Sequence, residues 1–531
     1  MNKTITSVVF SLAMIGTLHS QQNYYVDINS GNNANPGTIT QPVRTIQAGL
    51  DLSYSNPGVD TVNVLEGVYR EHVLVDHDVH LEAMPNATLK LAVGASEVIL
   101  IGGTSALAIS SETEITGFKL EGSGSMVGIR VVGGGLPCSP RIAWNSITGF
   151  QAGIQVESAG PSVVVSPTIN GNSVTGHTVL GLFSGVGLAA DPIDGGSINV
   201  ESRANRYQNL LYGIRMAPSQ GPNPGLVSLQ SYSDLIAKCI HGAYANSQYG
   251  AVSQTMLHTT ITNPGVIGFP PNPTSGIESL NGSVIVVGNS IVSLNSVTGT
   301  DLLADATSFI FEVGAGPFGL AGTSSNFIGS ANPGSPGFVS IALGDYHLLQ
   351  SSILVDQADL SLVAPGASNS VPTDADGSPR VSDGNFLDGN PSALPDVGAF
   401  EFSEASLDFQ NYSGTWAGYD PSTQPLVQMN PGSSVSYHLS GPPLGNYVFV
   451  LDPVTTPVNF LSPIWGNQLI VQSVLPHATG LLDATGLASG VLVYPLGTSF
   501  PEMRFAAQAW VSNPLLTEGG YTRRIELELS E

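Results

Sequence analysis

Short apolar strands that begin with glycine recur along the middle of the chain. In each, Gly is followed by an aliphatic residue or Ala and then by a few more strand residues, at Gly128, Gly153, Gly187, Gly213 and Gly242. The spacings are 25, 34, 26 and 29 residues, a mean of 28.5. A repeat of this length with strand alternation and no helical periodicity predicts β-strands stacked as the coils of a solenoid.

Alternation along these strands assigns their two faces, because successive side chains of a strand point to opposite sides. The positions directly after the glycines are expected inside: Ile129, Ile154, Leu188 and Ile214. The next positions form one outward column: Arg130, Gln155, Ala189, Arg215 and Tyr244. Such a column is a place where a long ligand could lie.

Asparagine recurs at one phase of the repeat, at Asn145, Asn172, Asn205 and Asn289. Stacked Asn side chains hydrogen-bond from coil to coil and satisfy polar turns that would otherwise be stranded. This pattern favours a structural ladder, and ligand contacts are the alternative interpretation.

Composition supports many tight turns and excludes one class of partner. Charged residues make up 10% of the chain, with 62 Gly and 36 Pro, and Gly and Asn supply the positive φ angles of turns. Lys and Arg number 15 against 40 Asp and Glu, a net charge of −25. This charge repels polyanions, which excludes nucleic acid and counts against a long acidic polysaccharide unless cations bridge the two.

The first twenty residues have the layout of a secretory signal peptide. Lys3 precedes an apolar run over residues 8–18, and Ser20 ends the segment. We therefore expect residues 1–20 to be removed and the protein to be secreted. No later segment is long and apolar enough to span a bilayer. As a separate expectation, the protein is a monomer.

Two segments resemble a known family. Residues 42–48 (PVRTIQA) and 60–71 (DTVNVLEGVYRE) are similar to the start of secreted pectate-lyase-like proteins with right-handed β-helix repeats. The resemblance implies a short helix that caps the first coil, and Thr45 is a suitable N-cap. Residues 374–380 (DADGSPR) and 396–402 (DVGAFEF) resemble the tail that closes many bacterial β-helix proteins. The expected fold is an all-β, right-handed parallel β-helix of the pectin-lyase type over residues 21–402.

The repeat stops after Phe402, and a different run of strands follows. Apolar strand-like segments occur at 447–451, 490–494, 504–511 and 524–529, separated by turn signals such as residues 430–432. We predict a small β-sandwich over residues 403–531. It resembles accessory domains of secreted bacterial proteins, which bind carbohydrate or a surface.

Motifs of the named enzymes with this fold are absent from the sequence. The Asn-Thr-Asp, Asp-Asp, Gly-His-Gly and Arg-Ile-Lys motifs of polygalacturonases and the Asp-Pro-His-Glu of mannuronan epimerases do not occur. A glycosidase needs two carboxylates at controlled separation, and a lyase needs a base and a cation or Arg beside the uronate. Whether the protein is an enzyme therefore stays open, and if it is one, the chemistry expected is polysaccharide lyase-like or glycoside hydrolase-like.

One zone is both basic and aromatic in an otherwise acidic chain. Aromatic faces stack on sugars, and Arg grips hydroxyls or carboxylates. The alternative is a solvated face whose arginines offset nearby acids. The substrate-binding candidates are Arg130, Arg203, Arg206, Tyr212, Arg215, His241 and Tyr244.

Two acidic segments suggest metal sites. Asp374 and Asp376, followed by Gly377, could ligate Ca²⁺, which prefers several oxygen ligands. Asx-turns in a closing cap explain the same residues. Residues 76–80 (DHDVH) have metal-binding content, but they also suit a turn between two strands.

Two functions follow from these patterns. The first is a secreted β-helix that binds, and in one version cleaves, an extracellular polysaccharide through the basic and aromatic zone. The second is a structural or adhesion protein, in which the solenoid is a spacer and residues 403–531 contact a cell-surface component. The fold alone does not decide between them.

Overall fold

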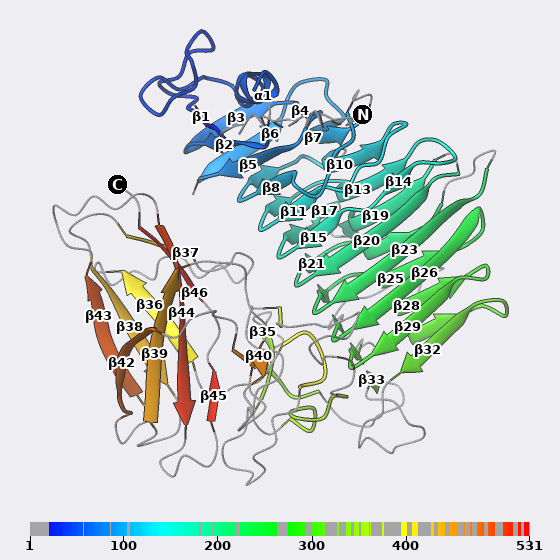
Figure 1. The fold of residues 1–531 in the computed structure, drawn as a ribbon. Helices are drawn as coiled ribbons and strands as arrows, with labels where there is room; N and C mark the ends of the chain where they lie inside the picture. Colours follow the sequence, from blue (N-terminus) through cyan, green and yellow to red (C-terminus); the bar gives the residue numbers. More distant parts are fainter. Residues whose placement is uncertain are drawn as a thin grey trace, which may run out of the picture.

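The computed structural model shows a parallel β-helix in which each coil passes in turn through three sheets (Figure 1). It describes residues 21–313 apart from short gaps, parts of 326–400, and from residue 406 onward mainly the strands. The gaps before 313 are 57, 85, 104–106, 125, 180–181, 194, 219–222, 263–273 and 294–299. The expected signal peptide lies outside the described residues.

The three sheets are built from strands that pair in parallel with the coils before and after them. Sheet 1 contains β1 (Asn23–Val26), β2 (Asp60–Val64), β5 (Val79–Ala83), β8 (Glu114–Thr116), β11 (Arg141–Ala143), β14 (Val164–Val165), β15 (Thr168–Asn170), β20 (Ser197–Arg203), β23 (Gly225–Tyr232), β26 (Gly250–Leu257), β29 (Val284–Gly288) and β32 (Phe309–Val313). Sheet 2 contains β3 (Gly67–Glu71), β6 (Ala87–Leu91), β9 (Lys119–Glu121), β12 (Ser146–Thr148), β16 (Ser173–Thr175), β21 (Arg206–Gln208), β24 (Leu235–Ala237), β27 (Thr260–Thr262), β30 (Ile291–Ser293) and β33 (Phe327–Ile328). Sheet 3 contains β4 (Val73–Val75), β7 (Glu97–Gly102), β10 (Val127–Gly133), β13 (Ala152–Ser158), β19 (Val186–Pro192), β22 (Tyr212–Met216), β25 (His241–Asn246), β28 (Ser275–Leu280) and β31 (Thr300–Ala304).

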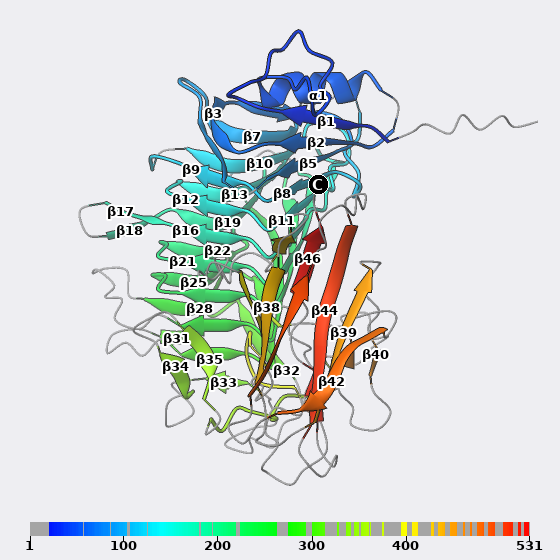
Figure 2. The same ribbon diagram turned by 90° about the vertical axis from the view of Figure 1, so that its left-hand side faces the viewer.

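The repeated glycines stand in register on sheet 3, where the backbone of the next coil comes close. A Cβ on Gly213 would lie 2.7 Å from the carbonyl oxygen of Gly242, and a Cβ on Gly242 would lie 2.4 Å from that of Gly276. A side chain therefore cannot fit, which explains why the glycine recurs once per coil. The 34-residue spacing between Gly153 and Gly187 contains an antiparallel hairpin of β17 (His177–Val179) and β18 (Leu182–Ser184), which projects from the stack in Figure 2.

The expected asparagine ladder lies in the turns between sheet 1 and sheet 2. Asn145 Nδ2 donates to Asn172 Oδ1 at 3.0 Å, and Asn172 Nδ2 donates to Asn205 Oδ1 at 3.0 Å. All three side chains are fully buried. The next coil continues the ladder with Asp234, whose Oδ1 accepts from the backbone N–H of Asn205 at 2.8 Å.

The ladder prediction is wrong for Asn289. Asn289 lies one residue before the ladder position of its turn. Its φ is 49°, a left-handed backbone conformation that asparagine tolerates. Ser290 occupies the ladder position, and its Oγ accepts from the N–H of Thr259 at 3.0 Å. Asn289 instead binds Asp359, accepting from its N–H at 2.8 Å and donating to its carbonyl at 3.0 Å.

The interior of the solenoid is one apolar core. Ile129, Ile154, Leu188 and Ile214 face into it with no exposed surface, as expected from the alternation. At the N-terminal end the helix α1 (Ile46–Tyr54) covers the first coil with Ile46 and Leu50. Thr45 is its N-cap, accepting from the N–H of Ala48 at 3.3 Å.

The tail segment covers the outer face of sheet 2 near its C-terminal end, rather than only closing the end of the solenoid. A second apolar cluster joins Leu235 and Ile291, which face outward from β24 and β30, to Tyr346, Leu354 and Phe400. Phe338 in β34 (Phe338–Ser340) and Leu348 in β35 (Asp345–Leu348), two strands that pair with each other, belong to the same cluster. This placement follows from the outward apolar residues of sheet 2, which need burial against another layer.

The C-terminal part contains further strands that do not continue the solenoid. One sheet holds β36 (Ser406–Asn411), β38 (Ser434–Ser440) and β43 (Leu487–Val493). A larger one holds β37 (Leu426–Met429), β39 (Asn446–Pro453), β42 (Leu475–Leu481), β44 (Met503–Ser512), β45 (Gly519–Tyr521) and β46 (Ile525–Leu529). A separate pair consists of β40 (Phe460–Leu461) and β41 (Gln468–Leu469). Within the part of the chain that the structure describes, no helix has the length and apolar character needed to cross a membrane.

Candidate functional site

The predicted outward column exists on sheet 3. Arg130 pairs in register with Gln155, and the same column continues through Ala189, Arg215 and Tyr244 to Glu278. Adjacent coils are about 4.8 Å apart. The column therefore spans about 24 Å along the solenoid axis.

Five residues on β22, β25 and β28 form one cluster on this face, which we call the tyrosine surface: Tyr212, Arg215, His241, Tyr244 and Glu278. The rings of Tyr212 and His241 stack with centroids 4.8 Å apart and planes 18° from parallel. Tyr244 meets Tyr212 edge-on at 5.2 Å. Stacked coils thus hold three rings together, and both tyrosines are half-buried rather than enclosed.

Hydrogen bonds fix the orientation of this cluster. His241 Nδ1 lies 3.1 Å from Glu278 Oε2 and 2.7 Å from Ser275 Oγ, which itself donates to Glu278 at 2.9 Å. Tyr244 Oη accepts from Asn246 Nδ2 at 2.8 Å. A histidine held by a carboxylate in this way has a fixed ring orientation, which general acid–base chemistry requires.

The titration behaviour of the tyrosine surface reflects its mixed charges. Burial raises the pKa of Glu278, but hydrogen bonds from His241 and Ser275 outweigh burial, and the pKa ends below its usual value. Burial, with Tyr244 and Glu278 nearby, raises the pKa of Tyr212, and Arg215 opposes this rise. Glu278 is therefore a carboxylate at neutral pH, and Tyr212 is a neutral phenol.

Arg130 lies four coils from Tyr244 in the same column, within a group of carboxylates. Its Nε is 3.1 Å from Glu157 Oε2, and its Nη1 is 3.6 Å from Glu97 Oε2. Gln155 Nε2 donates to the other oxygen of Glu157 at 2.7 Å. Both glutamates are nearly buried, so Arg130 is held between them by the protein itself.

The other two candidate arginines lie on different faces, and the seven candidates do not form one surface. Arg203 projects from sheet 1, where it binds Glu201 and lies over the ring of Tyr232 at 4.7 Å. Arg206 is on sheet 2, nearly buried, and lies over the ring of Phe400 at 5.3 Å. Arg206 thus helps to attach the tail segment to sheet 2.

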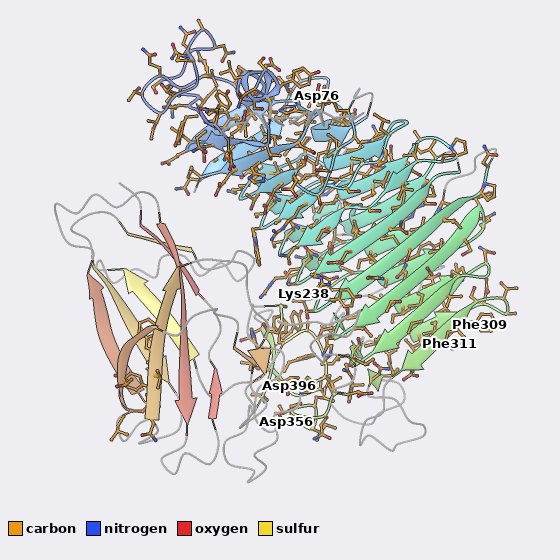
Figure 3. The ribbon with its side chains drawn as sticks, in the orientation of Figure 1. Asp76, Lys238, Phe309, Phe311, Asp356 and Asp396 are labelled. Atoms are coloured by element: carbon orange, nitrogen blue, oxygen red, sulfur yellow. The ribbon has the colours of Figure 1, made fainter. Side chains whose placement is uncertain are left out.

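The candidate calcium site is only partly within the described residues. Asp374 is buried, with 1% of its surface exposed, whereas Asp376 lies outside the described residues. Two other buried aspartates of the tail, Asp356 and Asp396, lie together because Asp396 Oδ1 accepts from the N–H of Asp356 at 2.7 Å (Figure 3). In the part of the chain that is described, no group of three or more His, Cys, Asp or Glu residues is arranged to hold a metal ion.

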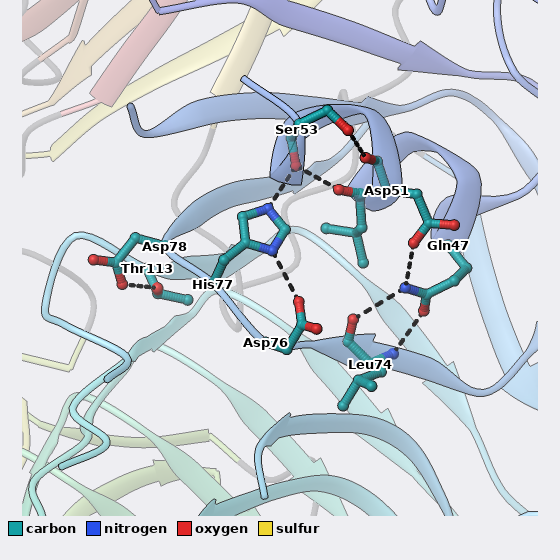
Figure 4. Close-up of polar contacts among 10 residues, drawn as sticks. Gln47, Asp51, Ser53, Leu74, Asp76, His77, Asp78 and Thr113 are labelled. Carbon is teal, nitrogen blue, oxygen red and sulfur yellow. Dashed lines mark hydrogen bonds and ion pairs between the residues drawn. The ribbon is translucent and has the colours of Figure 1, made fainter. Parts of the chain in front are cut away.

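The Asp-His-Asp segment at 76–78 forms a turn between β4 and β5, one of its two expected interpretations. Asp78 accepts from the N–H and Oγ of Ser110 at 2.8 and 2.7 Å and from Thr113 Oγ1 at 2.8 Å. His77 Nδ1 is 3.0 Å from Asp76, and its Nε2 is 2.7 Å from Ser53 Oγ (Figure 4). Sequence reasoning missed Ser53, because it lies in α1, far from the turn in sequence.

Ser53, His77 and Asp76 are connected like a hydrolase triad, but the serine is inaccessible. Ser53 has 1% of its surface exposed, and its Oγ also donates to the carbonyl of Leu50 at 2.9 Å. A nucleophile must reach its substrate. The chain of bonds therefore attaches α1 to the first coils, as Gln47 does by accepting from the N–H of Leu74 at 2.9 Å.

Replacing this serine tests the attachment. We expect Ser53→Ala to lower the free energy of unfolding by about 1 to 2 kcal/mol, because a buried hydrogen-bond partner of His77 is lost. Ser55→Ala is the matched control, since that exposed hydroxyl bonds only its own helix, and it should change stability little. Denaturant unfolding measures both. Labelling of Ser53 in the folded wild type by a fluorophosphonate would contradict the attachment role.

Comparisons with known proteins add little to this geometry. No protein-family model matches the chain, and no curated protein matches it. Among solved structures, the enzymatically active domain of tailspike protein 2 from bacteriophage CBA120 aligns over 92% of this chain and 73% of that chain. Its sequence identity is 13% and its TM-score is 0.26. A similarity at this level does not support an argument about function. Any functional proposal for this chain therefore rests on the geometry of its own residues.

Proposed function

We propose that the protein is secreted and binds an extracellular polysaccharide on the outer face of sheet 3, at the tyrosine surface. The observation that carries this proposal is the meeting of Tyr212, His241 and Tyr244 from two adjacent coils beside the guanidinium of Arg215. Rings offer apolar faces to sugars, and a guanidinium donates to their hydroxyls. Two tyrosines and an arginine are the residue types that dominate binding energy at recognition surfaces.

The same surface contains groups for acid–base chemistry, which favours cleavage as a second candidate. His241 is oriented by Glu278 and Ser275 and lies against the phenol ring of Tyr212. We also propose that the β-helix is right-handed and that residues 403–531 form a small β-sandwich. In the alternative function, the solenoid is a spacer and residues 403–531 make the contacts.

Removing a ring should weaken binding. We expect Tyr212→Ala to lower the affinity for a bound polysaccharide about tenfold, because one stacking face contributes about 1.4 kcal/mol. Tyr54→Ala is the control, since Tyr54 is exposed on the N-terminal cap and lies far from β22 in the stack. Affinity electrophoresis of the full chain across a polysaccharide panel measures this, and the same incubations are assayed for new reducing ends. Equal affinity of Tyr212→Ala and wild type for every glycan that binds would contradict the proposal.

A further inference from the structure

Two guanidinium groups stand in the outward column of sheet 3, at Arg130 and Arg215, and the first is already matched by carboxylates of the chain. Arg130 is bound by Glu157 and approached by Glu97. Arg215 differs, because among the described residues it makes no hydrogen bond or ion pair. Among the described residues, the column therefore presents one uncommitted guanidinium, Arg215, and the carboxylate of Glu278 two coils further on.

Three cations elsewhere in the described solenoid, Lys90, Lys119 and Arg141, are also paired with carboxylates. Lys90 and Lys119 both bind Glu121, at 2.6 and 2.9 Å. Arg141 lies 3.5 Å from Glu114. With a net charge of −25 for the whole chain, the field around the molecule repels a polyanion as it approaches.

We infer that the tyrosine surface selects an uncharged polysaccharide rather than a polyuronate, an inference that rests on the proposed function. A neutral sugar needs ring faces and hydroxyl partners. Tyr212 and Tyr244 supply the faces, and Arg215 supplies donors. Glu278, ionised at neutral pH, accepts from hydroxyls but repels carboxylates.

The column also gives the direction of the ligand. Six registered positions from Arg130 to Glu278 run along the stack, and the row continues into Leu100 on one side and Leu303 on the other. A glycan that uses this row lies parallel to the solenoid axis over about 24 Å. The row therefore contacts several sugar units of the glycan at once.

The test compares neutral and acidic polysaccharides with the full-length mature protein. Soluble neutral glucans, mannans, xylans and galactans are titrated beside polygalacturonate and alginate, at low and at high salt. We expect at least one neutral polymer to bind, with less than a twofold change in affinity between the two salt concentrations, because no ion pairing with the ligand is involved. We expect polyuronates to bind at least tenfold more weakly. Arg215→Ala should lose affinity for the neutral polymer.

The outcomes separate this inference from the proposed function. Polyuronate binding that equals or exceeds neutral binding, and that weakens with salt and with Tyr212→Ala, would overturn the selectivity and leave the tyrosine surface as a glycan site. Binding of no polymer in either class would overturn both. Neutral binding that is unchanged in Tyr212→Ala and Arg215→Ala would place the ligand elsewhere and also overturn both.

Discussion

Asn172→Ala is expected to lower the free energy of unfolding by about 4 kcal/mol, the largest single effect in the solenoid. Asn172 Oδ1 accepts from the N–H and the Nδ2 of Asn145, both at 3.0 Å. Its Nδ2 donates to the carbonyl of Ile142 at 2.9 Å and to Asn205 at 3.0 Å. Alanine leaves the N–H of Asn145 and the carbonyl of Ile142 buried without these partners, and each such loss costs about 1 to 3 kcal/mol.

Asn199→Ala is the matched control, because Asn199 is exposed on β20. It removes the same atoms from the surface and should change stability by less than about 0.5 kcal/mol. Urea unfolding of the three proteins, followed by circular dichroism, gives the comparison. A loss in Asn172→Ala no larger than in the control would show that the ladder does not stabilise the coils.

Asp234→Asn is expected to stabilise the protein at neutral pH. Asp234 is fully buried at the ladder position, and burial raises its pKa from 3.8 to about 6, although Ser202, Ser231 and Asn205 donate to it. The folded chain therefore holds this proton more tightly than the unfolded chain. The contribution to stability is complete below about pH 4 and is lost as the pH rises through about 6.

Asparagine removes this titration and keeps the ladder. Its Oδ1 can accept from Asn205, as Asp234 does, and its Nδ2 can donate to the hydroxyls of Ser202 and Ser231. Those hydroxyls have other neighbours, Tyr207 Oη at 3.1 Å and Thr259 Oγ1 at 3.3 Å. A pKa difference of this size corresponds to about 3 kcal/mol above pH 6.

The measurement is the difference in unfolding free energy between Asp234→Asn and wild type from pH 4 to pH 7. We expect the difference to grow in favour of the variant across this range and to level off above about pH 6. Taking the difference removes the opposite slope from acids with lowered pKa values, such as Glu278 and Asp27. A difference that is constant with pH would mean that Asp234 does not titrate in the folded chain within this range.

The regular part of the fold could be read from the sequence because one physical cause repeats in each coil. The glycine of sheet 3 recurs since a Cβ would meet the next carbonyl, and asparagine recurs since the turn needs a donor and an acceptor. Asp234 and Ser290 fill the same ladder position with other residue types. A search for asparagine therefore missed the first and chose Asn289 instead of the second.

The candidate site was harder to predict, because sequence neighbours diverge in a solenoid. Arg203, Arg206 and Arg215 lie within twelve residues of one another, yet they stand on sheets 1, 2 and 3. Residues that meet are one coil apart, as Tyr212 and His241 are. Counting one mean period from Tyr244 also misses Glu278, since this coil is 34 residues long.

The position of the tail was equally hidden from the pattern. The strands that contain Leu235 and Ile291 carry apolar residues on both of their faces. The structure shows that the outward-facing Leu235 and Ile291 are covered by Phe400 and its neighbours. The sequence motif around residue 396 indicated a closing segment. It did not indicate which face of the solenoid the segment covers.

The most direct test of the central claim is a crystal structure of the protein with a bound neutral oligosaccharide of five or more units. We expect the glycan along sheet 3, parallel to the solenoid axis, with sugar faces against Tyr212 and Tyr244 and hydroxyls within hydrogen-bond distance of Arg215. A glycan bound to sheet 1, or to the C-terminal strands after residue 406, with sheet 3 empty would contradict it.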